Sequence, residues 1–147
     1  MVSIKNLFEN DDVKVIQKQG DISVIEFQRD LSVSKSNAIE EYYAGQMNVR
    51  RRQVLIELKG NEYITSSGAM QWTAGNVEAS TNIKGVGDFL GKAIKGSVTK
   101  ESTVKPKYHG TGLLALEPTY RHILIEDVST WNGGMVLEDG LFLACEA

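Results

Sequence analysis

Apolar and polar side chains alternate with a period of two through most of the chain, and this pattern predicts a protein built mainly from short β-strands. The clearest pair of strands is residues 13–18 and 22–28, which flank Gln19-Gly-Asp. Alternation on both sides of a tight turn is typical of a hairpin of two half-buried strands. We therefore expect residues 1–33 to form an N-terminal hairpin region.

Residues 34–49 break the alternation and predict a helical insert with a short helix at about residues 37–46. Asn37 is placed to cap this helix, and Glu40 follows three residues later as a capping-box partner. Gly45 weakens the last turn. One face of the helix would be apolar and would carry Ile39, Tyr42, Tyr43 and Met47.

A second short helix is predicted at about residues 88–95, where Asp88 can cap and Gly96 ends the segment. Gly85 and Gly87 precede it, and Lys92 and Lys95 point away from its apolar side. Its apolar residues could also touch a membrane surface, but packing against the sheet is the favoured interpretation.

The pattern that predicts short strands continues from residue 50 to the end of the chain. Residues 50–58 form a strand that should end at the turn Lys59-Gly-Asn, from which residues 62–65 return. Gly75 and Asn76 should form the turn of another hairpin, in which Met70 and Trp72 share a face and Trp72 lies in the core. Later strands are expected at residues 98–104, 113–117, 121–126, 135–137 and 141–145.

Regular spacing of short strands predicts a β-sandwich or barrel-like fold. The chain has 147 residues, so we expect one domain in which residues 50–147 form the main β-rich part. A net charge of -3 argues against general affinity for nucleic acid or anionic membranes. Cys145 is the only cysteine, and no signal peptide or membrane-spanning run occurs, so a cytoplasmic location is expected.

Five motifs occur in a fixed order and contain Gly68, Met70, Trp72, Gly75, Asn76, Gly85, Gly87, Gly110, Gly112, Pro118, Gly140 and Phe142. Together they resemble the altered-inheritance-of-mitochondria family (Aim, number twenty-four), with the bacterial members as the closer match. The resemblance implies a β-rich fold related to the tryptophan RNA-binding attenuation protein (TRAP-like), of the double-stranded β-helix type. It implies no established biochemical activity. Relatives usually continue into a second β-rich half, so this chain is expected to be a short form or the N-terminal part of a longer relative.

No cofactor or catalytic group is expected from the motifs. The segment from Gly87 to Lys92 lacks the spacing of a phosphate loop, and Ala93 replaces the hydroxyl residue that would reach magnesium. His109 and His122 are expected to be surface or hydrogen-bonded residues, and nothing in their spacing predicts a metal site. Cys145 is expected to be a small apolar core residue.

Basic side chains are the most promising candidates for contact with a partner or an anion. They are Arg50, Arg51, Arg52, Lys92 and Lys95. A solvated face is nevertheless the favoured interpretation, because adjacent residues of a strand point to opposite sides.

The leading functional prediction is a non-enzymatic β-scaffold that acts through self-assembly or a protein partner. The alternatives are an RNA-binding protein and a small-ligand-binding or enzymatic barrel. A homo-oligomer is expected, because the apolar strand at residues 141–145 carries no Lys, Pro or bulge signal that would prevent pairing with another chain.

Overall fold

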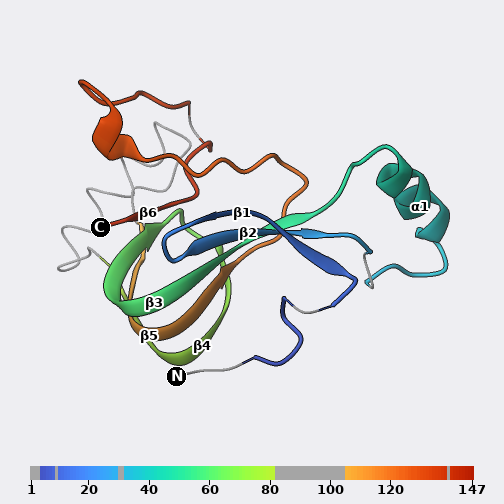
Figure 1. The fold of residues 1–147 in the computed structure, drawn as a ribbon, viewed down its shortest axis with the longest axis horizontal. Coiled ribbons are helices and arrows are strands. Elements are labelled where there is room, and N and C mark those ends of the chain that lie inside the picture. Colours follow the sequence, from blue (N-terminus) through green and yellow to red (C-terminus); the bar gives the residue numbers. More distant parts are fainter. Residues whose placement is uncertain (1–3, 9, 30–31, 82–104, 139) are drawn as a thin grey trace, which may run out of the picture.

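The computed structural model describes residues 4–8, 10–29, 32–81, 105–138 and 140–147, and its main element is a six-stranded antiparallel sheet. The strand order is β1-β2-β3-β5-β4, and β6 pairs separately with β3. Figure 1 shows that β3, β5 and β4 curve strongly together, while α1 lies apart from them. The elements are β1 (Val13–Gln19), β2 (Ile22–Phe27), α1 (Ala38–Gln46), β3 (Arg52–Thr65), β4 (Met70–Ser80), β5 (Lys107–Leu116), the 3-10 helix η1 (Val128–Thr130) and β6 (Ala144–Glu146).

The mainly β architecture and the N-terminal hairpin are confirmed. β1 and β2 pair in antiparallel register from Val13 opposite Phe27 to Gln19 opposite Ile22. Gly20 takes a positive φ of 55° in the turn between them. A register shift between Val15 and Gln17 places a bulge in β1.

The predicted turn at Lys59-Gly-Asn is wrong, because β3 continues through it as one strand of 14 residues. The pairing of β3 with β5 shifts register between Lys59 and Glu62, and Gly60 has a φ of 96°. Such a bulge bends a strand without reversing it. The glycine therefore marks the bend of β3 that is visible in Figure 1.

The turn predicted at Gly75 and Asn76 is also wrong, since both residues lie inside the continuous strand β4. Gly75 faces Gly112 of β5. A Cβ atom at Gly112 would lie 2.1 Å from the carbonyl oxygen of Ala74, and one at Gly110 would lie 2.2 Å from that of Asn76. These glycines therefore allow β4 and β5 to approach closely, which is a second reason, besides a turn, for glycine to occur in a strand.

Met70 and Trp72 lie on opposite faces of the sheet, so the prediction that they share a face is wrong. Met70 pairs with Leu116 and Trp72 with Ala115, because the register shifts between the two β4 residues. Directly paired residues share a face, and neighbours on β5 do not. The bulge in β4 therefore interrupts the regular alternation of side chains between the two faces of the sheet at this point.

The sheet carries a larger and a smaller core, one on each face. The larger core contains Val24, Val54, Ile56, Leu58, Tyr63, Ala69, Tyr108, Leu114 and Leu116. It is covered by the chain that follows β5, through Ile123, Ile125 and Leu143. The smaller core contains Ile25, Leu55 and Ala115, against which Leu7 and Trp72 pack. Trp72 is partly buried rather than a fully buried core residue.

The strands predicted at residues 121–126 and 135–137 do not form. Ile123 and Ile125 lie on the larger core as an irregular segment, which explains their alternation without strand pairing. The predicted strand at residues 141–145 is reduced to β6, which pairs with β3 at Tyr63–Thr65. The predicted helix at 88–95 and strand at 98–104 lie outside the described residues.

The helix predicted at residues 37–46 is confirmed as α1, but the predicted capping box is not formed. Asn37 Oδ1 accepts hydrogen bonds from the backbone N and Oγ of Ser34 at 2.7 and 2.9 Å, and it makes no bond to the helix. A local turn therefore uses the oxygen that would cap the helix. No residue of α1 is buried, and its predicted apolar face is exposed: Ile39, Tyr42, Tyr43 and Met47.

Candidate functional site

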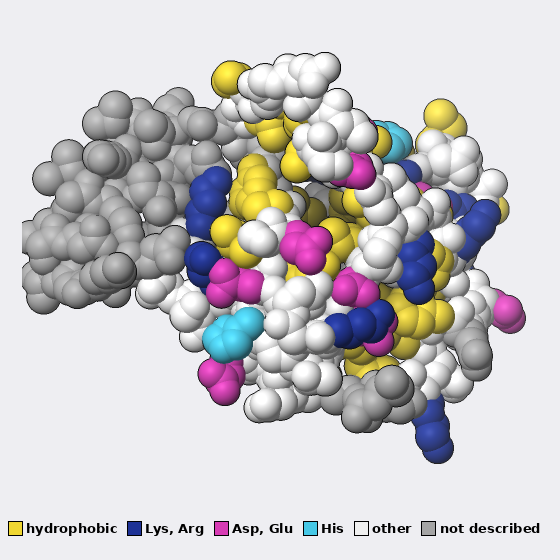
Figure 2. Space-filling model, turned by 60° about the vertical axis from the view of Figure 1, so that its left-hand side comes forward, with side chains coloured by type: hydrophobic (Ala, Val, Ile, Leu, Met, Phe, Trp, Pro, Cys, Tyr) yellow, Lys and Arg dark blue, Asp and Glu magenta, His cyan; other side chains and the backbone are white. Residues whose placement is uncertain are grey.

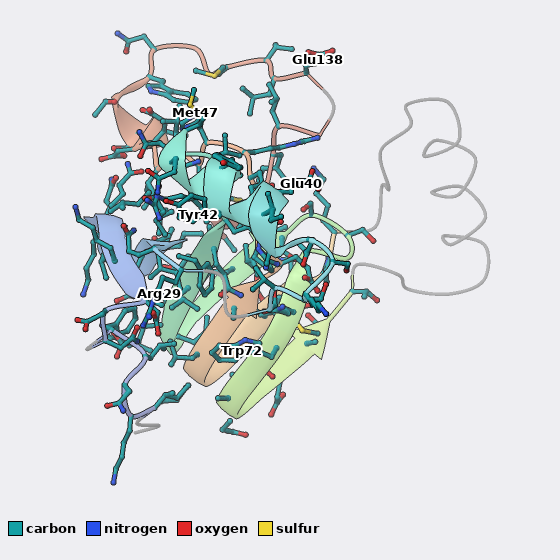
Figure 3. All side chains as sticks on the ribbon, turned by 90° about the vertical axis from the view of Figure 1, so that its right-hand side faces the viewer. Arg29, Glu40, Tyr42, Met47, Trp72 and Glu138 are labelled. Carbon is teal, nitrogen blue, oxygen red and sulfur yellow. The ribbon has the colours of Figure 1, made fainter. Side chains whose placement is uncertain are left out.

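A cleft of about 380 Å³ lies between α1 and the nearby end of the sheet. Figure 3 views this region from the side of α1, with Tyr42 labelled at the helix and Arg29 labelled below it; both residues line the cleft. The lining comes from the end of β2, from α1 and from the chain just before β3. It consists of Phe27, Gln28, Arg29, Val33, Ala38, Glu41, Tyr42, Gly45, Gln46, Val49, Arg50, Arg51 and Tyr120.

Arg50 is the half-buried cation of this cleft. Its Nη1 donates to the carbonyl oxygen of Gln28, and its Nη2 donates to that of Gly45 at 3.3 Å. These two bonds connect the end of β2 to the last turn of α1. Both partners are neutral, and within the described part of the chain Arg50 has no carboxylate partner.

Arg51 and Tyr120 form the far wall of the cleft. The guanidinium carbon of Arg51 lies 6.0 Å from the centre of the Tyr120 ring, which is a cation–π distance, and Arg51 also donates to Ser32 Oγ. The Tyr120 hydroxyl donates to Glu41 at 3.2 Å. Burial, followed by this bond to Glu41, raises the pKa of Tyr120.

Arg52 points elsewhere, since it is buried at the start of β3. Its Nη2 lies 2.9 Å from Glu26 Oε2 of the neighbouring strand. The three consecutive arginines therefore have separate environments: Arg50 and Arg51 line the cleft, whereas Arg52 forms an ion pair within the sheet. Lys92 and Lys95 lie outside the described residues.

Those residues of the five sequence motifs that the structure describes lie in turns and packing contacts that shape the fold. Gly68 has a φ of 76° between β3 and β4, and Gly140 has a φ of 83°. Thr119, which follows Pro118, exchanges backbone hydrogen bonds with Arg52. Phe142 packs under Lys105, with the ammonium nitrogen 4.2 Å from the ring centre. Gly85 and Gly87 are not among the described residues.

His109, His122 and Cys145 are not brought together. His109 Nε2 on β5 lies 3.4 Å from Glu78 Oε2, while His122 is exposed in the segment after β5. Cys145 is exposed rather than in the core, because β6 pairs only with the end of β3. Partial burial by its neighbours raises the pKa of its thiol. Across the described ranges, no three His, Cys, Asp or Glu side chains are grouped to hold a metal ion.

Elsewhere on the surface several charged side chains form ion pairs, and the two signs are mixed. Lys107 Nζ lies 2.6 Å from Glu62 Oε1, and Lys59 Nζ lies 2.7 Å from Asp21 Oδ1. Figure 2 shows basic and acidic side chains interspersed around apolar ones on one face of the molecule. That face therefore offers no surface of a single sign.

The sequence analysis missed Arg29, Glu41 and Tyr120 as cleft residues. Tyr120 and Glu41 are 79 positions apart in the chain, and no local pattern connects them. Only the single arginine run, of which Arg50 and Arg51 are part, could indicate this region from sequence.

The two outer strands of the sheet, β1 and β4, differ in how they would resist pairing with another chain. β1 has seven residues, a bulge, and two lysines, Lys14 and Lys18. β4 has 11 residues that are mostly exposed and include no Lys, Arg or Pro. No described strand pairs with the outer edge of β4. Glu78 is the one charged residue of β4, and long edge strands without lysine or proline are templates for strand addition.

Among the described residues, no helix has both the length and the apolar character needed to cross a membrane.

Comparison with known proteins identifies one family. No curated protein and no solved structure gives a significant match. The family model described as Mitochondrial biogenesis AIM24 matches residues 46–147, which include β3, β4, β5 and β6. The match covers more than half of the chain and includes the glycine motifs that shape the curved sheet, so the chain belongs to the Mitochondrial biogenesis AIM24 family.

Proposed function

We propose that this protein is a non-catalytic β-scaffold that associates with copies of itself through the outer edge of β4. The observation that carries the proposal is the contrast between the two outer strands. β1 carries two lysines that discourage pairing, whereas β4 is longer and has neither lysine nor proline; both strands contain a register shift.

Assembly through this edge satisfies backbone groups that face outward on β4. Antiparallel addition of a second β4 strand would extend the sheet across a two-fold axis and give a closed dimer. The strong curvature of β3, β5 and β4 supports the TRAP-like relationship, of the double-stranded β-helix type, that the sequence resemblance implies. We extend the proposal to that architecture and to a cytoplasmic protein of bacterial type.

The contact surface proposed here differs from the one that the sequence predicted. Residues 141–145 were the expected edge, but only Ala144–Glu146 form a strand, and at three residues that strand offers a much shorter edge than β4. The long free edge of β4 therefore gives better support to self-association.

RNA binding receives less support from the arrangement of the arginines. Single-strand binders combine a basic groove with aromatic platforms along the backbone path. Here Arg52 is buried against Glu26, and only Arg50 and Arg51 reach the cleft. Tyr120 contacts Arg51 within the cleft, but Trp72 packs on the smaller core of the sheet, away from these arginines.

The test compares the mass of the purified protein in solution with that of two matched variants. Asn76 is exposed on β4 and Asn132 is exposed in the segment after η1. Asn76→Lys places a charge on the outer strand, whereas Asn132→Lys adds the same charge elsewhere. Light scattering coupled to size exclusion should show an oligomer for the wild type and for Asn132→Lys, and a smaller species for Asn76→Lys. A monomeric wild type at high concentration contradicts the proposal, as does an Asn76→Lys oligomer of unchanged mass.

A further inference from the structure

The cleft beside α1 contains a positive charge that the described protein groups do not neutralise. Arg50 is half-buried, and its only described partners are the carbonyl oxygens of Gln28 and Gly45. A guanidinium has further N–H groups in a planar fork, and this fork matches a carboxylate with two parallel hydrogen bonds. A partly desolvated cation gains most from an anion that can reach it.

The other charges of the cleft define how much negative charge it accepts. Arg29 is already paired with Asp12. Glu41 lies in the cleft wall, where it accepts the Tyr120 hydroxyl. Arg51 and Glu41 both contact Tyr120 in the far wall, where their opposite charges offset each other. A dianion such as a phosphate ester would meet the Glu41 carboxylate, whereas a single carboxylate would match the remaining charge of Arg50.

The remainder of the lining is suited to an apolar body. Phe27, Val33, Ala38 and Val49 contribute aliphatic and aromatic surface, and the Tyr42 ring lies on the helix side. The cleft of about 380 Å³ is partly open and several of its lining side chains are exposed, so it suits a small ligand that keeps part of its surface in water. We propose that this cleft binds a small monocarboxylic acid with an apolar or aromatic body, and that Arg50 holds its carboxylate.

The first experiment uses phenylacetate as the probe and the full chain labelled with ¹⁵N. Titration should shift the amide signals of residues 45–51 and leave those of β4 unchanged. The uncharged analogue 2-phenylethanol should shift them far less, because it lacks the carboxylate. Phenyl phosphate should bind more weakly than phenylacetate. Equal binding of 2-phenylethanol, tighter binding of phenyl phosphate, or shifts located outside the cleft would each overturn the proposal.

A pair of arginine variants tests the anchor. Arg50→Gln should weaken phenylacetate binding by about tenfold or more, since it removes a charged hydrogen-bond donor. Arg121→Gln is the matched control: the Arg121 guanidinium also donates to a backbone carbonyl, that of Gly140 at 3.1 Å, but it lies outside the cleft. The control should bind phenylacetate as the wild type does. If Arg50→Gln binds phenylacetate with unchanged affinity, a residue other than Arg50 holds the carboxylate and the proposal is wrong.

A third variant keeps the proposal testable if Arg50→Gln does not fold. Glu41→Gln removes the negative charge from the cleft wall and leaves Arg50 in place. It should tighten phenylacetate binding by about twofold to fivefold and should improve phenyl phosphate binding even more. If neither affinity changes, the charge balance on which the proposal depends is wrong.

Discussion

At the scale of single residues, the glycines of β5 have the clearest physical role. Gly110 and Gly112 both face the backbone of β4 at distances that no Cβ atom tolerates. The position of Gly110 also has a φ of 119°, which favours glycine independently of space. Both residues belong to a motif by which the sequence resembles the family. The close approach of β4 and β5 gives the physical reason for glycine at these two positions of the motif.

We predict that Gly112→Ala destabilises the protein by about 1–3 kcal/mol or more, because the new methyl group must displace the backbone of Ala74. Gly45→Ala is the control with the opposite sign. Gly45 lies in the last turn of α1 with open space around it, so alanine there should stabilise by about 0.5–1 kcal/mol. Urea unfolding of the three proteins measures both changes. A Gly112→Ala protein as stable as the wild type would contradict the close approach.

At the scale of elements, α1 is unusual because none of its residues is buried. A nine-residue helix is marginal by itself in water. Three contacts hold its C-terminal half and its cleft-facing side: Val49 N donates to Ala44 O at 2.9 Å, Arg50 donates to Gly45 O, and the Tyr120 hydroxyl donates to Glu41. Polar contacts, rather than an apolar face, therefore position this helix and with it the cleft.

We predict that polar substitutions on the exposed face of α1 leave stability nearly unchanged. Ile39 is 76% exposed and Met47 is 77% exposed, so Ile39→Ser and Met47→Ser should each change the free energy of unfolding by less than about 0.5 kcal/mol. Leu114→Ala provides the contrast, because Leu114 is fully buried and its truncation should cost about 2–5 kcal/mol. Thermal melting followed by circular dichroism distinguishes these cases. A large loss in the α1 variants would mean that this face is covered in solution.

At the scale of the whole molecule, within the residues that the structure describes, an irregular segment rather than a second sheet covers the larger core. The chain after β5 crosses one face of the sheet and contributes Ile123 and Ile125 to it, while Leu124 between them is 76% exposed. Figure 1 shows this orange segment leaving the end of β5 and passing alongside the sheet before the chain reaches β6. The fold thus depends on contacts between residues far apart in the sequence.

We predict that the double substitution Ile123→Ser and Ile125→Ser lowers stability by about 1–3 kcal/mol, since both side chains lose apolar contact with the larger core. Leu124→Ser, which changes an equally apolar neighbour, should have little effect. Chemical denaturation monitored by tryptophan fluorescence measures the difference. Equal losses in the two proteins would show that the segment does not bind the sheet through these alternate residues.

The sequence by itself determined the elements whose signals are local. Period-two alternation and a tight glycine turn are sufficient for the β1–β2 hairpin, and helical spacing is sufficient for α1. The glycine motifs were also sufficient to recognise the family. These features depend on a few neighbouring residues, so no information about the rest of the chain was needed.

Only the tertiary structure decided what those local signals meant. Gly60 and Gly75 were interpreted as turns, but the neighbouring strand β5 pairs on both sides of each, so the chain continues as a bent strand. The three arginines were identified as a group, yet pairing of β3 with β2 buries Arg52 against Glu26 and leaves Arg50 beside α1. A glycine permits a turn, a bulge or a close approach with similar local energy, and the choice among them depends on contacts with residues distant in the sequence.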